Sequence, residues 1–250
     1  MTAATATPAS RLIGHRTLWV RRIGQLIVGL FLYGIGLALM VRAGIGVAPW
    51  DVLSQGVSHL TGVPFGLVTN ILGALVLLLW IPIKVRVGVG TVANVLLLGT
   101  SAQLGLNVIP QQTVPAVQAL VFSGGLALVA VATGLYIGAR LGPGPRDGLM
   151  TGLHRRTGRP IWMVRTAIEV AVLIVGVLLG GQFGIGTIAF ALLIGPMVGV
   201  TMPLFHIPEA APSPVEPLSL VEPVETPSAL VEPSPVEPVE TPPRPRKPTS

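Results

Sequence analysis

The sequence repeats itself once at a fixed offset of 96 residues, and this duplication limits the folds that the chain can adopt. Residues 42–64 read RAGIGVAPWDVLSQGVSHLTGVP, and residues 140–160 read RLGPGPRDGLMTGLHRRTGRP. From the Pro-(Trp/Arg)-Asp step onward the two stretches stay in register at this offset, so that Asp51 matches Asp147 and Pro64 matches Pro160. The register continues downstream, where GVGT at residues 88–91 matches GIGT at residues 184–187. Self-similarity at one gapless offset predicts two copies of the same structural unit.

Composition places both copies in a membrane. Apolar residues make up 51% of the chain and charged residues 10%, with a mean hydropathy of +0.76. A soluble domain carries about 25% charged residues. The net charge of +6 does not predict a nucleic-acid partner, because the basic residues lie between apolar runs and act there as topology signals. The absence of cysteine excludes disulfides and thiolate metal sites.

Six apolar runs are long enough to cross a bilayer, which takes about 20 residues. After the first and the fourth run, residues 49–60 and 145–156 begin with proline and are followed by glycine, so each predicts a short helix. These helices are amphipathic and either lie on the membrane surface or re-enter it part-way. The six runs are residues 23–41, 64–83, 87–109, 115–139, 161–180 and 183–204.

The fold class is therefore an all-α membrane protein of six transmembrane helices in two three-helix repeats, each with a short amphipathic or re-entrant helix. Residues 1–22 form an N-terminal segment, residues 23–109 the first repeat and residues 115–204 the second. Residues 206–250 are a Pro-Val-Glu tract that cannot bury a core, so we expect a disordered tail.

The basic residues predict the orientation. If the N-terminus is cytoplasmic, every lysine and arginine except Arg42 falls in a cytoplasmic segment, including those of the tail. Both termini are then cytoplasmic. Because three spans is an odd number, the second copy enters the membrane in the opposite direction. The copies are thus inverted repeats, related by a pseudo-two-fold axis in the membrane plane.

No catalytic constellation is present in the sequence. It lacks a phosphate-binding loop with a lysine, a serine elbow and a metal-binding helix motif, so we expect neither an enzyme nor a cofactor or metal. Ionisable residues inside spans are the better functional candidates. Glu169 is the acidic residue well inside an apolar run, and Arg165 precedes it at i,i+4 spacing. The pair either holds the fold or belongs to a proton or solute pathway.

Two asparagines and two aspartates complete the candidates. Asn70 and Asn94 lie inside spans and either bond a neighbouring helix or contact a substrate. Asp51 and Asp147 either stabilise the first turns of the short helices or come together near the midplane by symmetry. The candidate pathway residues are Asp51, Asn70, Asn94, Asp147, Arg165 and Glu169.

Two arginines end the first span of each copy. Arg42 and Arg140 either extend to the membrane interface or neutralise the two aspartates of the short helices.

Both copies contain distinctive segments, namely AGIGVAPWD, GVGTVANVLLLG, PRDGLMTGL, RRTGRP, VRTAIEV and GIGTIAFALLIGP. Together these segments resemble the YczE-like bacterial integral membrane proteins, a largely uncharacterised group related to the broader YitT family. The resemblance covers about residues 20–204 and implies a multi-pass protein of the bacterial inner membrane. It supplies no catalytic residues, and the Pro-Val-Glu tail departs from it.

Inverted repeats are typical of secondary transporters, whose sites lie near the midplane beside helices interrupted by glycine or proline. Here the interruptions are Gly88 and Gly90, Gly184 and Gly186, and Pro196. The first hypothesis is a small secondary transporter or exporter that carries a small solute or a proton through a site between the repeats.

The alternative hypothesis is a non-transporting membrane scaffold or regulator that acts through the cytoplasmic loop at residues 140–165 and the tail. Since six spans make a small bundle, we also consider a homodimer.

Overall fold

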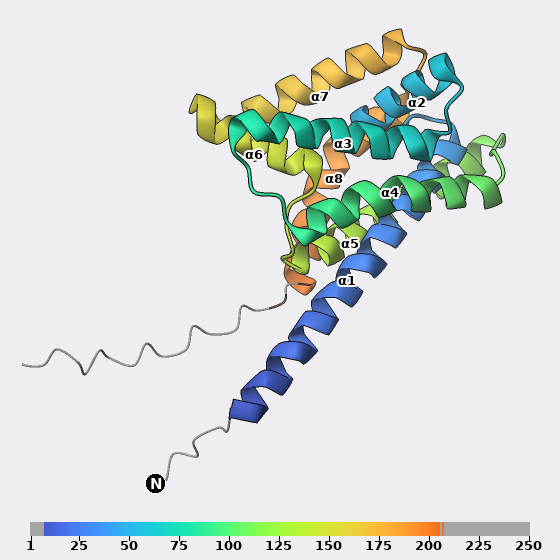
Figure 1. Cartoon of the computed structure of the whole chain (residues 1–250). Coiled ribbons are helices and arrows are strands. Elements are labelled where there is room, and N and C mark those ends of the chain that lie inside the picture. Colours follow the sequence, from blue (N-terminus) through green and yellow to red (C-terminus); the bar gives the residue numbers. More distant parts are fainter. Residues whose placement is uncertain (1–7, 206, 208–250) are drawn as a thin grey trace, which may run out of the picture. The chain divides into compact units, whose positions relative to one another are not determined.

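The computed structural model describes residues 8–205 and 207 of the 250-residue chain, with side chains described from residue 17. Apart from turns, the described part consists of helices (Figure 1). Six of them are long and apolar enough to cross a membrane, and α2 and α6 are not among these six. In chain order the helices are α1 (Pro8–Ala43), α2 (Pro49–Thr61), α3 (Phe65–Ile83), α4 (Val89–Val108), α5 (Pro115–Gly138), α6 (Pro145–Thr157), α7 (Ile161–Leu178) and α8 (Ile185–Leu204).

This element order confirms the all-α class, the six spans and the two short helices. The largest difference is at α1, which begins at Pro8 although the first apolar run begins at residue 23. Arginine is a good helix former, so the basic segment continues the helix, and its apolar part starts at Thr17. Residues 1–7 of the N-terminal segment, and the tail apart from residue 207, lie outside the described residues.

The ends of the short helices follow from the prolines and glycines of the repeat. Proline is the first residue of both α2 and α6, where its fixed φ suits a helix start. Both helices end at a glycine in the left-handed region, Gly62 (φ 72°) and Gly158 (φ 66°). Each of these glycines donates its N–H to a carbonyl of the last turn. The two copies of the motif therefore fold alike.

The turn before each short helix has the same unusual backbone in both copies. Gly44 (φ 76°) corresponds to Arg140 (φ 57°), and Gly46 (φ 117°) corresponds to Gly142 (φ 128°). A residue with a side chain is uncommon at positive φ. Arg140 nevertheless adopts it, at the position that corresponds to Gly44.

Each half of the chain binds the loop of the other half. The N–H of Gly90 in α4 donates to the carbonyl of Leu141 at 2.8 Å. At the same offset of 96 residues, the N–H of Gly186 in α8 donates to the carbonyl of Ile45, also at 2.8 Å. These reciprocal bonds satisfy backbone groups that the loops would otherwise leave unpaired.

Threonines at the starts of α4 and α8 add a second reciprocal pair. The hydroxyl of Thr91 donates to the carbonyl of Pro143 at 2.8 Å. The hydroxyl of Thr187 accepts from the N–H of Val47 at 3.2 Å. The neighbouring glycines permit this approach, since a Cβ on Gly88 would lie 2.5 Å from a backbone oxygen. The GVGT and GIGT segments are therefore close-packing sites.

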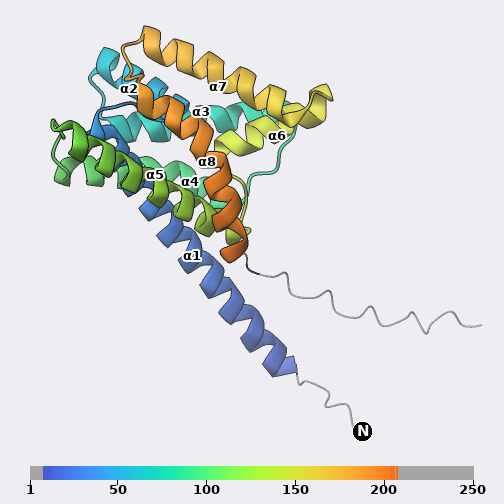
Figure 2. The same cartoon turned by 180° about the vertical axis from the view of Figure 1, so that it is seen from behind.

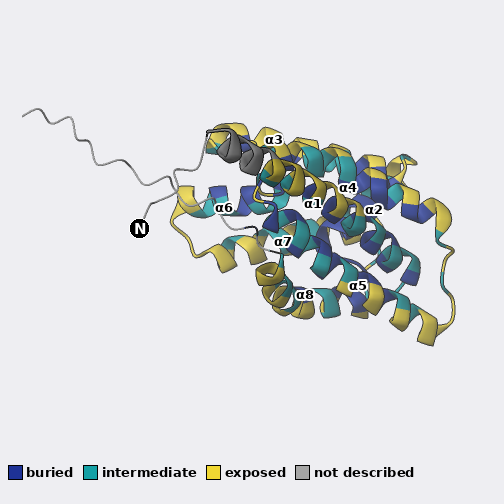
Figure 3. Ribbon diagram, turned by 90° about the horizontal axis from the view of Figure 1, so that it is seen from below, coloured by how far each residue is buried: buried dark blue, intermediate teal, exposed yellow. Residues whose placement is uncertain are grey.

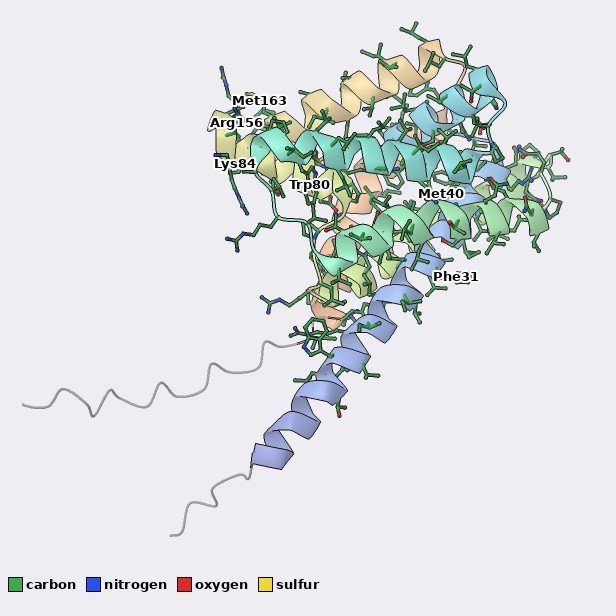
Figure 4. The ribbon with its side chains drawn as sticks, in the orientation of Figure 1. Phe31, Met40, Trp80, Lys84, Arg156 and Met163 are labelled. Carbon is green, nitrogen blue, oxygen red and sulfur yellow. The ribbon has the colours of Figure 1, made fainter. Side chains whose placement is uncertain are left out.

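The helices form two groups, which Figures 1 and 2 show from opposite sides. In the first group, α4, α1, α5 and α8 pack side by side in that order. In the second group, α2, α3, α6 and α7 form a closed circuit in which each helix contacts the next. Buried residues face the interior and exposed residues lie along the outer faces (Figure 3). On α1, for example, Met40 is fully buried whereas Phe31 is 47% exposed (Figure 4).

The two halves differ in how closely their last two helices pack, which are α3 and α4 in the first half and α7 and α8 in the second. Helix α3 packs closely against α4, whereas the corresponding helices α7 and α8 do not approach each other in this way. A Cβ on Gly99 would lie 2.1 Å from the carbonyl oxygen of Gly66, so the two backbones touch. In the second half Trp162 replaces Gly66, and Gly195, the counterpart of Gly99, has open space at its Cβ position. The second half therefore makes no matching backbone contact at these positions.

This difference predicts that a glycine-to-alanine substitution lowers stability at position 99 more than at the corresponding position 195. Gly99→Ala should lower the free energy of unfolding by about 1–3 kcal/mol, because the new methyl group forces α3 away from α4. Gly195→Ala is the control and should change it little. Thermal unfolding in detergent measures both variants. Equal losses would contradict the close contact between α3 and α4.

Candidate functional site

A cavity of about 330 Å³ lies between the two groups of helices, and all eight helices contribute residues to it. This volume is at the lower end of the roughly 300–1,000 Å³ of small-molecule sites. Five of the six predicted pathway residues line it, and the sixth, Asp51, lies next to a lining residue. The lining residues with charged or amide side chains are Asn70, Asn94, Arg146, Asp147, Arg165 and Glu169.

The first turns of α2 and α6 meet at this cavity. Arg146 of α6 donates from Nη2 to Oδ1 of Asp51 in α2 at 3.2 Å, and Asp51 is fully buried. The Arg146 guanidinium also lies over the ring of Trp50, 5.3 Å from its centroid. Trp50 and Arg146 occupy the same position in the two copies, 96 residues apart. Burial raises the pKa of the Asp51 carboxyl, and the charge and hydrogen bond of Arg146 oppose the rise.

The partner of Asp51 was not among the sequence candidates. Arg42 and Arg140 were considered as its counter-charge, but the ion pair of Asp51 is to Arg146. Arg42 instead donates to the carbonyl of Leu106 near the end of α4. In the sequence, Arg146 is one of the basic residues that predict the orientation. Its place opposite Trp50 in the aligned copies was the available indication.

Asp147 lies beside a tyrosine and an asparagine. The hydroxyl of Tyr136 in α5 donates to Oδ2 of Asp147 at 2.8 Å. Oδ2 of Asp147, the Tyr136 hydroxyl and Nδ2 of Asn94 all lie within 3.5 Å of the Cβ position of Gly144. The ring of Tyr33 packs edge-on against that of Tyr136, with centroids 6.1 Å apart. Neither tyrosine was a sequence candidate, because aromatic residues in apolar spans usually fill the core.

The two asparagines of the spans have different roles. Nδ2 of Asn70 donates to the carbonyl of Leu96 at 3.2 Å and to the hydroxyl of Thr100 at 3.1 Å. Its Oδ1 accepts from the N–H of Gly99 at 2.9 Å. Asn70 therefore joins α3 to α4, although it borders the cavity. The carboxamide of Asn94 makes no hydrogen bond to the described residues and is available to a ligand.

The remaining candidates lie on α7. Nε of Arg165 donates to Oε1 of Glu169 at 2.9 Å, which is the i,i+4 pair expected from their spacing. Their side chains are 53% and 28% exposed, so the pair forms an accessible part of the cavity wall. The glycines at the starts of α4 and α8 do not line the cavity, because they pack against the loops before α2 and α6.

Comparison with known proteins identifies the family. The family of unknown function DUF6198 matches residues 20–203. The chain belongs to this family. An uncharacterized protein of Haemophilus influenzae is 35% identical to this DUF6198 protein over 199 residues, which are 77% of this chain and 91% of the relative. No solved structure matches the chain.

Two relatives in Bacillus subtilis carry names. The uncharacterized membrane protein YczE is 29% identical over 177 residues, which are 70% of this DUF6198 chain and 82% of YczE. The uncharacterized protein YyaS is 26% identical over 184 residues, which are 71% of this chain and 90% of YyaS. These matches confirm the YczE-like resemblance and the assignment as a membrane protein.

Arg146 should be essential for stability because it neutralises a buried carboxylate. Arg146→Met should lower the free energy of unfolding by about 3–5 kcal/mol, since Asp51 would remain buried and unpaired. The double variant Asp51→Asn, Arg146→Met removes both charges and should recover much of this loss. Thermal unfolding in detergent of the single and double variants measures the coupling. Additive losses would show that the two side chains do not depend on each other.

The two asparagines should respond differently to truncation. Asn70→Ala removes three hydrogen bonds between α3 and α4 and should cost about 1–2 kcal/mol of stability. Asn94→Ala removes no hydrogen bond to the described residues and should cost less. The same unfolding measurement compares them. A loss at position 94 as large as at position 70 would give Asn94 a structural role.

Proposed function

We propose that this protein is a small secondary transporter or exporter with its site between two inverted repeats. The observation that carries the proposal is the cavity, which brings charged and amide side chains together inside a bundle of six apolar helices. Ionisable groups at such positions are costly and mark solute or proton pathways. The first turns of both short helices border the cavity, as at the sites of inverted-repeat transporters.

The contacts of the short helices support re-entry into the membrane from opposite faces. Near the end of α2, the ring Nδ1 of His59 lies 3.1 Å from the carbonyl oxygen of Gly180, which follows α7. Near the end of α6, Arg156 donates to the carbonyl of Pro82 in α3 at 2.5 Å. Figure 4 shows Arg156 together with Lys84 at this end of α3. Since α3 and α7 each cross the membrane, the outer ends of α2 and α6 belong to opposite faces and their first turns meet between them.

The charge pattern supports an orientation for this arrangement. With the N-terminus in the cytoplasm of a bacterium, the end of α6 and its arginines face the cytoplasm, while the end of α2 faces outward. The protein is then a multi-pass protein of the inner membrane with both termini cytoplasmic.

The difference between the halves supports alternating access. Transporters of this kind work by moving one repeat or helix pair against the other around a fixed site. In this chain α3 is held to α4, while α7 is separate from α8 and carries Arg165 and Glu169. The second half is therefore the half whose helices are placed to move.

Cysteine labelling tests the proposal, because the chain has no cysteine of its own. In Asn94→Cys the thiol lies in the cavity, and we expect a membrane-impermeant maleimide to label it in right-side-out and in inside-out vesicles. The control Leu104→Cys, on the outer face of the same helix, should remain unlabelled, because Leu104 is 53% exposed toward lipid and thiolates need water.

Two results would contradict transport. An Asn94→Cys variant that is unlabelled from both sides would indicate a dry core and favour the scaffold alternative. The same variant labelled from one side in every condition would indicate a fixed cleft.

A further inference from the structure

Aromatic side chains are concentrated around the cavity. The chain has four tryptophans, two tyrosines and six phenylalanines. Both tyrosines line the cavity, together with Trp50 and Phe190. The electron-rich faces of such rings attract cations, and a group of them around one space is the usual site for alkylated ammonium groups. Trp50 already holds one cation in this way, since the Arg146 guanidinium lies over its ring.

The ion pairs of the described residues leave a negative charge in the cavity. Arg146 pairs with the buried Asp51, and Arg165 pairs with Glu169, so each arginine is neutralised. The hydrogen-bond partner of Asp147 is the neutral hydroxyl of Tyr136. Among the described side chains, Asp147 is thus a cavity carboxylate without a counter-charge.

Unpartnered polar groups lie at the same place. Trp50 is 8% exposed and lines the cavity, and its Nε1 has no hydrogen-bond partner among the described residues. The carboxamide of Asn94 also lacks a described partner, and its Nδ2 lies near Oδ2 of Asp147 around Gly144. Buried polar groups are almost always paired in folded proteins, so the indole N–H of Trp50 points to a ligand. The half-buried carboxamide of Asn94 borders the same cavity.

The rest of the wall is apolar. Helix α8 contributes Ile194, Val198 and Met202, and α4 contributes Val95 and Leu98. A ligand that fills this space therefore has apolar substituents beside its charged centre. An inorganic ion would leave this part of the wall without a partner.

We propose that the cavity binds an organic cation, an alkylated ammonium group with apolar substituents, with Asp147 as its counter-charge. Tyr33, Tyr136 and Phe190 surround the cationic centre, and the apolar wall of α4 and α8 contacts the substituents. This inference rests on the proposed transport function and names its class of substrate.

Two thiol reagents of similar size and opposite charge test the inference in the full-length Asn94→Cys variant. The cation is 2-(trimethylammonium)ethyl methanethiosulfonate, and the anion is 2-sulfonatoethyl methanethiosulfonate. Each rate is divided by the rate of that reagent with a free thiol in solution. We expect the cation to react with the thiol at position 94 about tenfold faster or more, because one unpaired charge lies within a few ångströms.

Matched variants identify which residue causes the faster reaction of the cationic reagent. Asp147→Asn in the Asn94→Cys background removes the charge and should abolish the preference for the cation. Tyr136→Phe keeps the ring and the carboxylate and should retain it. Tetraethylammonium should slow the modification of the thiol when Asp147 is present, relative to sodium chloride at the same ionic strength, and should not do so in Asp147→Asn. Monodisperse elution in detergent and an unreactive Leu104→Cys establish that each variant is folded.

The outcomes separate this inference from the proposed function. If neither reagent reacts with the thiol at position 94, the cavity is dry and the transport proposal fails with it. If the anion reacts faster, if Asp147→Asn leaves the preference unchanged, or if tetraethylammonium gives no protection, the cation assignment is overturned. A water-filled pathway then still stands.

Discussion

The meeting of the first turns of α2 and α6 is the contact on which the rest of the structure depends. Arg146 joins them by pairing with Asp51 and lying over Trp50, and the reciprocal bonds to Leu141 and Ile45 hold the preceding loops. Inside a membrane every backbone polar group needs a partner within the protein, so the proposed re-entry of α2 and α6 depends on such partners. The cavity lies where the two helix starts meet, and its polar lining follows from their sequence.

Much of this architecture could be predicted from the sequence because it depends on local signals. Apolar runs give the spans, and proline and glycine give both ends of the short helices. The four candidates inside spans line one cavity because polar residues in spans avoid lipid. The sequence could not distinguish the role of Asn70 from that of Asn94, since both are amides at the same place in their spans. Only the contact of α3 with α4 shows that Asn70 joins these helices. The role of Arg146 was missed because its contacts are to the other copy.

The two copies share a scaffold and differ around the cavity. The capping glycines, the loop turns and the reciprocal bonds are repeated. The residues that line the cavity are not repeated. Trp50 in the first copy corresponds to Arg146 in the second, and Asn94 corresponds to Phe190. Duplication thus accounts for the fold, and divergence after duplication accounts for the chemistry of the site. The two copies therefore place different side chains around the cavity.

The exposure of α7 has a consequence for how the protein responds to its membrane. Within α7 the structure describes every residue, and Gly176 is the one that is buried. At 18 residues it is also the shortest of the six spans of the described part. A helix of this length rises about 27 Å, slightly less than the roughly 30 Å of hydrocarbon in a typical bilayer. We therefore expect bilayer thickness to act directly on the helix that carries Arg165 and Glu169, and lipid composition to influence the geometry of the cavity.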